Sequence, residues 1–197
     1  DTRRADQLLA EQHPEYLFYC VSRDASLHGV PQSRVVRHYE PRVRAAELMA
    51  SGVNSLVGQR CRRLLQLFAS AGLDSSNIGV TGSLLVGAET DRSDIDLVVY
   101  GDEAFQRARD VIAQAARGSA ISPLCEEDWI AAHRRRGCEL TLEEYVWHER
   151  RKHNKAMFEG TKFDISWGNL SQLTSTDGER PAYSSTAISS SISASRG

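Results

Sequence analysis

The sequence predicts an α+β fold, because short β-branched runs alternate with segments whose apolar residues recur at helical spacing. Residues 78–80 (Ile-Gly-Val) and 94–100 (Asp-Ile-Asp-Leu-Val-Val-Tyr) are typical of strands. Residues 54–71 and 102–115 carry apolar side chains three and four positions apart, as one face of a helix requires, and Asn54 can cap the first of these helices. The order helix, strand, turn, strand, helix therefore forms the core of the predicted fold.

The first 53 residues predict a helical N-terminal extension. Residues 6–11 have the composition of a helix, and residues 16–21 (Tyr-Leu-Phe-Tyr-Cys-Val) form an aromatic and β-branched run that fits a strand. Residues 34–50 predict a further helix, which Pro41 either starts or kinks. The arginines of this segment fit a solvated helix face or, alternatively, contacts with a polyanionic substrate.

Two helices and a strand are predicted after the core. Residues 123–136 are acidic at their start and basic at their end, which complements the helix dipole. Residues 141–158 begin with Thr-Leu-Glu-Glu, a capping-box sequence, and predict a second helix. Residues 161–167 (Thr-Lys-Phe-Asp-Ile-Ser-Trp) fit a strand. Three basic residues are expected on one side of the second helix: His148, Arg151 and Lys155.

Length and composition limit the function classes. With 197 residues and 41% hydrophobic residues, the chain suits one domain with appendages. Its formal charge of −2 excludes a global field for nucleic-acid binding, so any such binding needs a local patch. No apolar run approaches the length of a membrane span, no signal peptide is visible, and the four separated cysteines predict reduced thiols in a cytoplasmic protein.

Two aspartates near the middle of the chain predict a metal site. Asp94 and Asp96 lie two positions apart on a predicted strand, so their side chains face the same side. Two such carboxylates repel each other unless a cation lies between them, and hard divalent ions take oxygen ligands of this kind. Upstream, Gly82 and Ser83 open a helical turn whose backbone N–H groups suit a phosphate. Together these features indicate phosphoryl-type transfer.

Gly82-Ser83, Gly87 and the run Ser-Asp-Ile-Asp-Leu at residues 93–97 together resemble the signature of the DNA polymerase β-like nucleotidyltransferase superfamily. The resemblance implies a small mixed sheet flanked by helices, in a stand-alone nucleotidyltransferase domain over residues 54–168. The segments before and after it would then be the extension of residues 1–53 and a Ser-rich flexible tail over residues 169–197.

The resemblance also implies a third carboxylate on a neighbouring strand. Asp164 is the downstream candidate with suitable surroundings; the alternative is a plain exposed strand residue. In the implied two-metal mechanism, Mg²⁺ or Mn²⁺ binds the carboxylates, an acceptor hydroxyl attacks the α-phosphate of a nucleoside triphosphate such as ATP, and pyrophosphate leaves. The expected catalytic and metal-binding residues are Asp94, Asp96 and Asp164, and the expected nucleotide-binding residues are Gly82, Ser83, Arg92 and Lys162.

Two other functions remain open at this point. One is a catalytically silent nucleotide-binding regulatory member of the same fold. The other is a non-enzymatic RNA-binding module that uses the basic N-terminal segment and the basic side of residues 148–155. The sequence also leaves the acceptor open among an RNA end, a protein hydroxyl and a small molecule.

Overall fold

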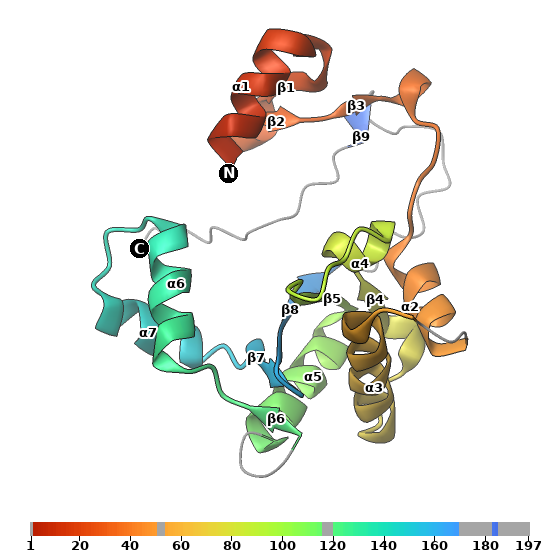
Figure 1. Ribbon diagram of the computed structural model, residues 1–197, viewed down its shortest axis with the longest axis vertical. Coiled ribbons are helices and arrows are strands. Elements are labelled where there is room, and N and C mark those ends of the chain that lie inside the picture. The colour runs from red at the N-terminus through yellow and green to blue at the C-terminus, as the bar shows by residue number, and fades with distance from the viewer. Residues whose placement is uncertain (1, 51–53, 116–119, 170–182, 185–197) are drawn as a thin grey trace. The chain divides into compact units, whose positions relative to one another are not determined.

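A mixed β-sheet organises the larger of two compact units into which the chain divides, Tyr39–Thr174. The computed structural model describes residues 2–50, 54–115, 120–169 and 183–184. Among these residues of the larger unit, five strands form one sheet in the order β4-β5-β8-β7-β6 (Figure 1). Their bounds are β4 (Ile78–Val80), β5 (Ile95–Tyr100), β6 (Ile121–Ser122), β7 (Lys155–Phe158) and β8 (Thr161–Gly168).

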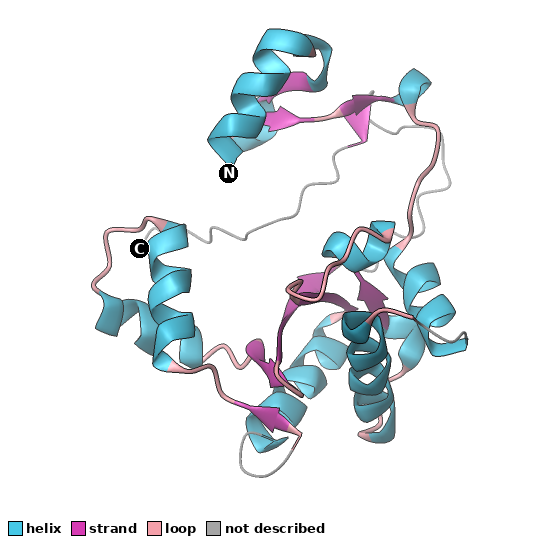
Figure 2. Ribbon diagram, in the orientation of Figure 1, coloured by secondary structure: helices cyan, strands magenta, loops and turns pink. Residues whose placement is uncertain are grey.

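Only the central pair of the sheet is parallel. β5 runs parallel to β8, whereas β4 pairs antiparallel with β5, β7 with β8, and β6 with β7. Figure 2 shows helices around these strands, so the predicted α+β class with a mixed sheet flanked by helices is confirmed. The helices of this unit are α2 (Pro41–Ala50), α3 (Leu56–Ser70), α4 (Gly82–Val86), α5 (Asp102–Ala115), α6 (Glu126–Arg136) and α7 (Leu142–Arg150), with a 3₁₀ turn at Ser75–Asn77.

The main core lies where α3 and α5 pack against the sheet. Phe68 of α3 meets Phe163 of β8 edge to face, with ring centroids 6.5 Å apart. Both rings are fully buried, as expected for the apolar stripe that the sequence predicts on α3. Other core members come from α3, α5 and the strands, and include Leu64, Leu65, Ile95, Leu97, Ala108, Ile112 and Ile165.

Helix α2 belongs to the same unit as the sheet. It begins at Pro41, one of the two outcomes that the sequence left open, because proline is well suited to the first turn of a helix. At Gly79 of β4 an added Cβ would lie 2.5 Å from the Pro41 Cβ, so glycine permits the close approach of the helix to the strand. α2 thus packs within the compact unit Tyr39–Thr174, and the predicted start of the nucleotidyltransferase domain at residue 54 stays a prediction.

The N-terminal cap of α3 is Ser55 and not the predicted Asn54. The Ser55 hydroxyl accepts a hydrogen bond from the Gly58 backbone N–H at 3.2 Å. Replacing Ser55 with alanine is expected to destabilise the protein by about 1 kcal/mol, because that N–H loses its partner. Asn54→Ala is the matched control and should change the stability by less than half as much. Denaturant unfolding checks both variants, and equal effects would contradict the assignment of the cap.

A helix predicted through residue 158 is wrong beyond α7. α7 ends at Arg150, and Lys155 begins a strand that pairs with β8, so Lys155 does not share a helix face with His148. The turn from β7 to β8 consists of Glu159 and Gly160, with φ of 48° and 77°. Two residues with positive φ fit the right-handed twist of a hairpin, and this pairing overrides the helical preference of the segment.

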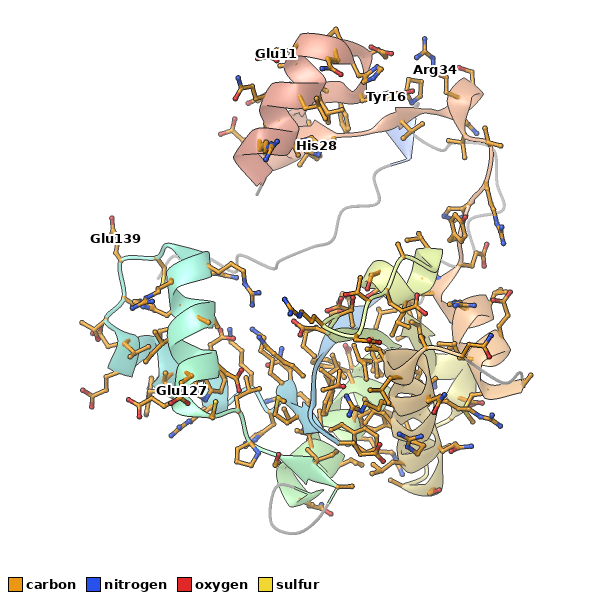
Figure 3. All side chains as sticks on the ribbon, in the orientation of Figure 1. Glu11, Tyr16, His28, Arg34, Glu127 and Glu139 are labelled. Carbon is orange, nitrogen blue, oxygen red and sulfur yellow. The ribbon has the colours of Figure 1, made fainter. Side chains whose placement is uncertain are left out.

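The smaller unit contains the N-terminal elements. The helix predicted over residues 6–11 and the strand predicted over residues 16–21 are both confirmed. Arg34 lies over the ring of Tyr16 at 5.9 Å. Both side chains are labelled in Figure 3. The described elements of the smaller unit are α1 (Thr2–Gln12), β1 (Leu17–Cys20), β2 (Ala25–His28), β3 (Val30–Pro31) and β9 (Tyr183–Ser184), with 3₁₀ turns at Pro14–Tyr16, Val21–Arg23 and Gln32–Arg34.

The predicted flexible tail lies outside the described residues, except for Asn169 and the short strand β9. β9 pairs antiparallel with β3.

Neither disulfides nor membrane-length apolar helices occur in the described part of the chain. No two of the four cysteines are joined, and burial raises the pKa of Cys61 to about 12. Each described helix is too short or too polar to cross a lipid bilayer.

Candidate functional site

Two of the predicted carboxylates lie side by side on the sheet. Asp96 of β5 is in register with Asp164 of β8, so both side chains project from the same face of two adjacent strands. Adjacent strands are about 4.8 Å apart. Asp94 comes immediately before β5 and is exposed, while Asp96 and Asp164 are half-buried. The structure therefore brings together residues that lie far apart in the chain.

The surroundings of Asp164 disfavour its negative charge. Burial, followed by the charge of Asp96, raises the pKa of Asp164 to about 6, and Asp94 raises it further. Lys155 and Lys162 oppose this shift of the pKa but do not cancel it. A raised pKa of this kind suits a group that accepts a proton during a reaction.

Asp96 has a similar environment. Burial is the main cause that raises its pKa, and the charge of Asp94 adds to it. Lys162 and Arg135 lower the pKa of Asp96 and offset part of the effect. The three aspartates thus repel one another, and the nearby basic residues offset only part of this repulsion.

The turn before α4 is built directly against Asp96. The backbone N–H of Thr81 donates to the Asp96 carbonyl oxygen at 2.8 Å. Gly82 follows with φ of 62°, and a Cβ added there would collide with the Asp96 carboxylate. Thr81 is the N-cap residue of α4, and its side chain makes no capping hydrogen bond to the helix. The helix-opening amides expected near Asp96 are therefore in place beside this carboxylate.

The other predicted nucleotide contacts differ in their position. Lys162 lies on the same face of β8 as Asp164, opposite Met157 of β7, and is half-buried. Ser83 is the second residue of α4 and is half-buried. Arg92 is exposed in the turn before β5, where its backbone N–H donates to the Thr90 hydroxyl at 3.4 Å.

The donor chemistry suits a hard divalent cation, since Asp94, Asp96 and Asp164 supply only carboxylate oxygens. Their mutual repulsion, seen in the raised pKa values of Asp96 and Asp164, is what a bound cation would relieve. Among the described side chains, however, no three His, Cys, Asp or Glu groups are already arranged to hold a metal ion. The residues fit the implied metal by type, and Asp94, Asp96 and Asp164 are its expected ligands.

Sequence reasoning missed a group of charged residues beside Asp164. Lys155 of β7 lies directly opposite Asp164 on the same face of the sheet. Its ammonium group bonds the Glu149 carboxylate at 2.8 Å, and Lys152 bonds the other oxygen of Glu149 at 2.5 Å. The signal that could have found Lys155 is the alternation of residues 155–158 before Glu-Gly, which is typical of a hairpin.

A cavity of about 530 Å³ lies apart from these carboxylates, between α6 and α7. The exposed ring of Trp147 lines it and is stacked by Arg151 at 3.4 Å. Trp129, also in its wall, is buried in a second apolar cluster with Leu124 and Tyr145. Trp129 is therefore part of the core of this helix pair.

Comparison with known proteins yields an archaeal relative. The chain is 31% identical over 168 residues to "Uncharacterized protein MJ1086" of Methanocaldococcus jannaschii, a match that covers 84% of this chain and 49% of the relative. The chain thus spans about half the length of the curated relative that it matches. No family model matches the chain, and no solved structure is significantly similar to it. Because the relative is itself described as uncharacterized, the similarity adds no activity to what the site indicates.

Proposed function

We propose that this protein is a metal-dependent nucleotidyltransferase, which transfers a nucleoside monophosphate from a nucleoside triphosphate to an acceptor hydroxyl. The observation that carries the proposal is the alignment of Asp96 with Asp164 on two parallel strands. The amide-lined turn at Gly82, packed against the Asp96 carboxylate, adds support because it offers a phosphate site next to the metal ligands.

Each residue has a defined role in the proposed reaction. The backbone N–H groups of Gly82 and Ser83 donate to triphosphate oxygens, and Lys162 neutralises part of their charge. Asp164 accepts the proton of the acceptor hydroxyl, whose oxygen then bonds the α-phosphorus while the bond to the bridging oxygen breaks and pyrophosphate leaves. Bound Mg²⁺ or Mn²⁺, held by the three aspartates, would stabilise the negative charge that develops on the phosphate oxygens.

The RNA-binding alternative loses part of its support in this fold. Arg44 donates to the Leu84 carbonyl at 2.9 Å, and Arg42 lies over the Tyr100 ring at 5.5 Å, so both have structural partners. Lys155 does not share a helical stripe with Arg151. The silent nucleotide-binding alternative keeps the same site and differs only in the absence of turnover.

The test is release of pyrophosphate. The protein is incubated with each labelled nucleoside triphosphate, with Mg²⁺ or Mn²⁺, and with pooled RNA, protein and small-molecule acceptors. We expect pyrophosphate release that depends on the metal and on one acceptor pool. Nucleotide binding without pyrophosphate under every condition would favour the silent alternative. RNA binding that needs no metal and survives Asp96→Asn would favour the RNA-binding module.

A further inference from the structure

The site has two ends, defined by the order of the strands. Gly82 and the start of α4 lie beside Asp96 on β5. Asp164 follows on β8, and Lys155 follows on β7, in register with Asp164 and on the same face. The proposed triphosphate seat is thus at one end of the row, and Lys155 is at the other. An acceptor whose hydroxyl meets Asp164 would extend toward Lys155.

Lys155 is held in place by a buried carboxylate. Its Nζ lies 2.8 Å from an oxygen of Glu149, whose side chain is only 8% exposed. The side chain of Lys155 is 23% exposed, against 53% for Lys152, which bonds the other oxygen of the same carboxylate at 2.5 Å. An ammonium group has three N–H donors, so the bond to Glu149 holds Lys155 in place and leaves other donors for a ligand.

The charges at this end add up to a positive excess. Lys152 and Lys155 carry two positive charges against the single negative charge of Glu149, which leaves one positive charge. Lys162 lies on the same face of the sheet as Lys155 and adds a positive charge to that face. Two divalent cations would carry four positive charges against the three negative charges of the aspartates, and the excess at Lys155 would then attract an anion.

We propose that the acceptor carries a phosphate group, and that Lys155, held by Glu149, forms an ion pair with this phosphate beside Asp164. The inference rests on the proposed function, since the transfer reaction gives the acceptor its place next to Asp164. The phosphate belongs either to a phosphorylated small molecule or to an RNA end, because both present the same group to the lysine. Lys155 is then a substrate-binding residue, and Glu149 positions it.

Binding of three probes tests the proposal without requiring turnover. Calorimetry measures ribose 5-phosphate, unphosphorylated ribose and a trinucleotide RNA, with Mg²⁺ and a non-hydrolysable ATP analogue present. We expect ribose 5-phosphate to bind at least about tenfold more tightly than ribose, as a charge-assisted hydrogen bond provides. An RNA affinity well above that of ribose 5-phosphate would identify a nucleic-acid end, and equal affinities would identify a small molecule.

Three variants separate binding from structural support. Lys155→Met should weaken ribose 5-phosphate binding about tenfold or more, and Lys155→Arg should retain most of it because the charge remains. Lys152→Met is the matched control, since it removes an ion pair to the same carboxylate at a more exposed position. It removes one charge of the positive excess but no contact with the phosphate, so it should weaken binding by about twofold, much less than Lys155→Met does. The melting temperature of each variant shows that it is folded.

Defined results would overturn the inference. Equal binding of ribose and ribose 5-phosphate would do so, as would equal effects of Lys155→Met and Lys152→Met. Transfer to a phosphorylated acceptor that is unchanged in Lys155→Met would refute the phosphate contact and leave the proposed function standing. Phosphate binding that depends on Lys155, without any pyrophosphate release, would instead refute the function and keep the site. If Lys155→Met does not fold, competition between inorganic phosphate and ribose 5-phosphate on the wild-type protein decides, and its absence overturns the proposal.

Discussion

Asp164→Asn is expected to abolish nucleotidyl transfer and, at the same time, to stabilise the metal-free protein at neutral pH. Transfer should fall by about a hundredfold or more, because the variant lacks both the proton acceptor and a metal ligand next to Asp96. Asparagine has nearly the shape of aspartate but no charge, so the sheet should remain intact. Activity and stability would then change in opposite directions, as expected where carboxylates that bind a metal repel one another in its absence.

The effect of Asp164 on stability depends on pH in a defined direction. Its pKa in the folded protein is raised from 3.8 to about 6, so the folded state binds this proton more tightly than the unfolded state. Stability from this group is therefore complete below about pH 4 and is lost as pH rises through about 6. Above pH 6 the Asp164→Asn variant should be more stable than the wild type by about 1–3 kcal/mol, with allowance for solvent screening.

Unfolding by denaturant in the presence of a chelator, at pH 4 and pH 8, measures this difference. The advantage of Asp164→Asn should be present at pH 8 and nearly absent at pH 4. Asp91→Asn removes the same charge from an exposed turn residue before β5 and serves as the control for both activity and stability. Undiminished pyrophosphate release by Asp164→Asn would remove Asp164 from the mechanism.

The elements that the sequence predicts well are those defined by local patterns. The strand at residues 78–80, the turn at Gly82 and the strand that follows Asp94 all occur where their residue types place them. Caps are less certain, because Asn54 and Ser55 are both good capping residues and only the backbone geometry selects Ser55.

The register of the sheet is a different kind of information. Asp96 and Asp164 meet because β5 and β8 pair in parallel across a long stretch of chain, and no local pattern encodes that pairing. The resemblance to a known superfamily led to the choice of Asp164, whereas the residues alone left a plain exposed aspartate open. The sequence around Lys155 predicts a helix because its neighbours favour helices, whereas pairing with β8 makes Lys155 a strand residue beside the site.

Gly82→Ala should destabilise the protein by about 2–4 kcal/mol and abolish transfer. About 1–2 kcal/mol comes from the left-handed backbone, since Gly82 has φ of 62°. A further contribution of about 1–2 kcal/mol comes from overpacking, because the new Cβ meets the Asp96 carboxylate. Rotation of that carboxylate would relieve the collision but would move an expected metal ligand, so activity should be lost even where the fold survives.

Gly87→Ala provides the matched control for this substitution. Gly87 ends α4 with φ of 69°, but a Cβ there has no neighbouring atom within 4 Å. The control should therefore show the backbone cost alone, about 1–2 kcal/mol, and should retain transfer. The difference between the two variants, measured by denaturant unfolding and by pyrophosphate release, isolates the contact between Gly82 and Asp96. If both variants lose the same stability and keep the same activity, the Gly82 turn does not hold Asp96 in place, and the phosphate seat loses its link to the carboxylates.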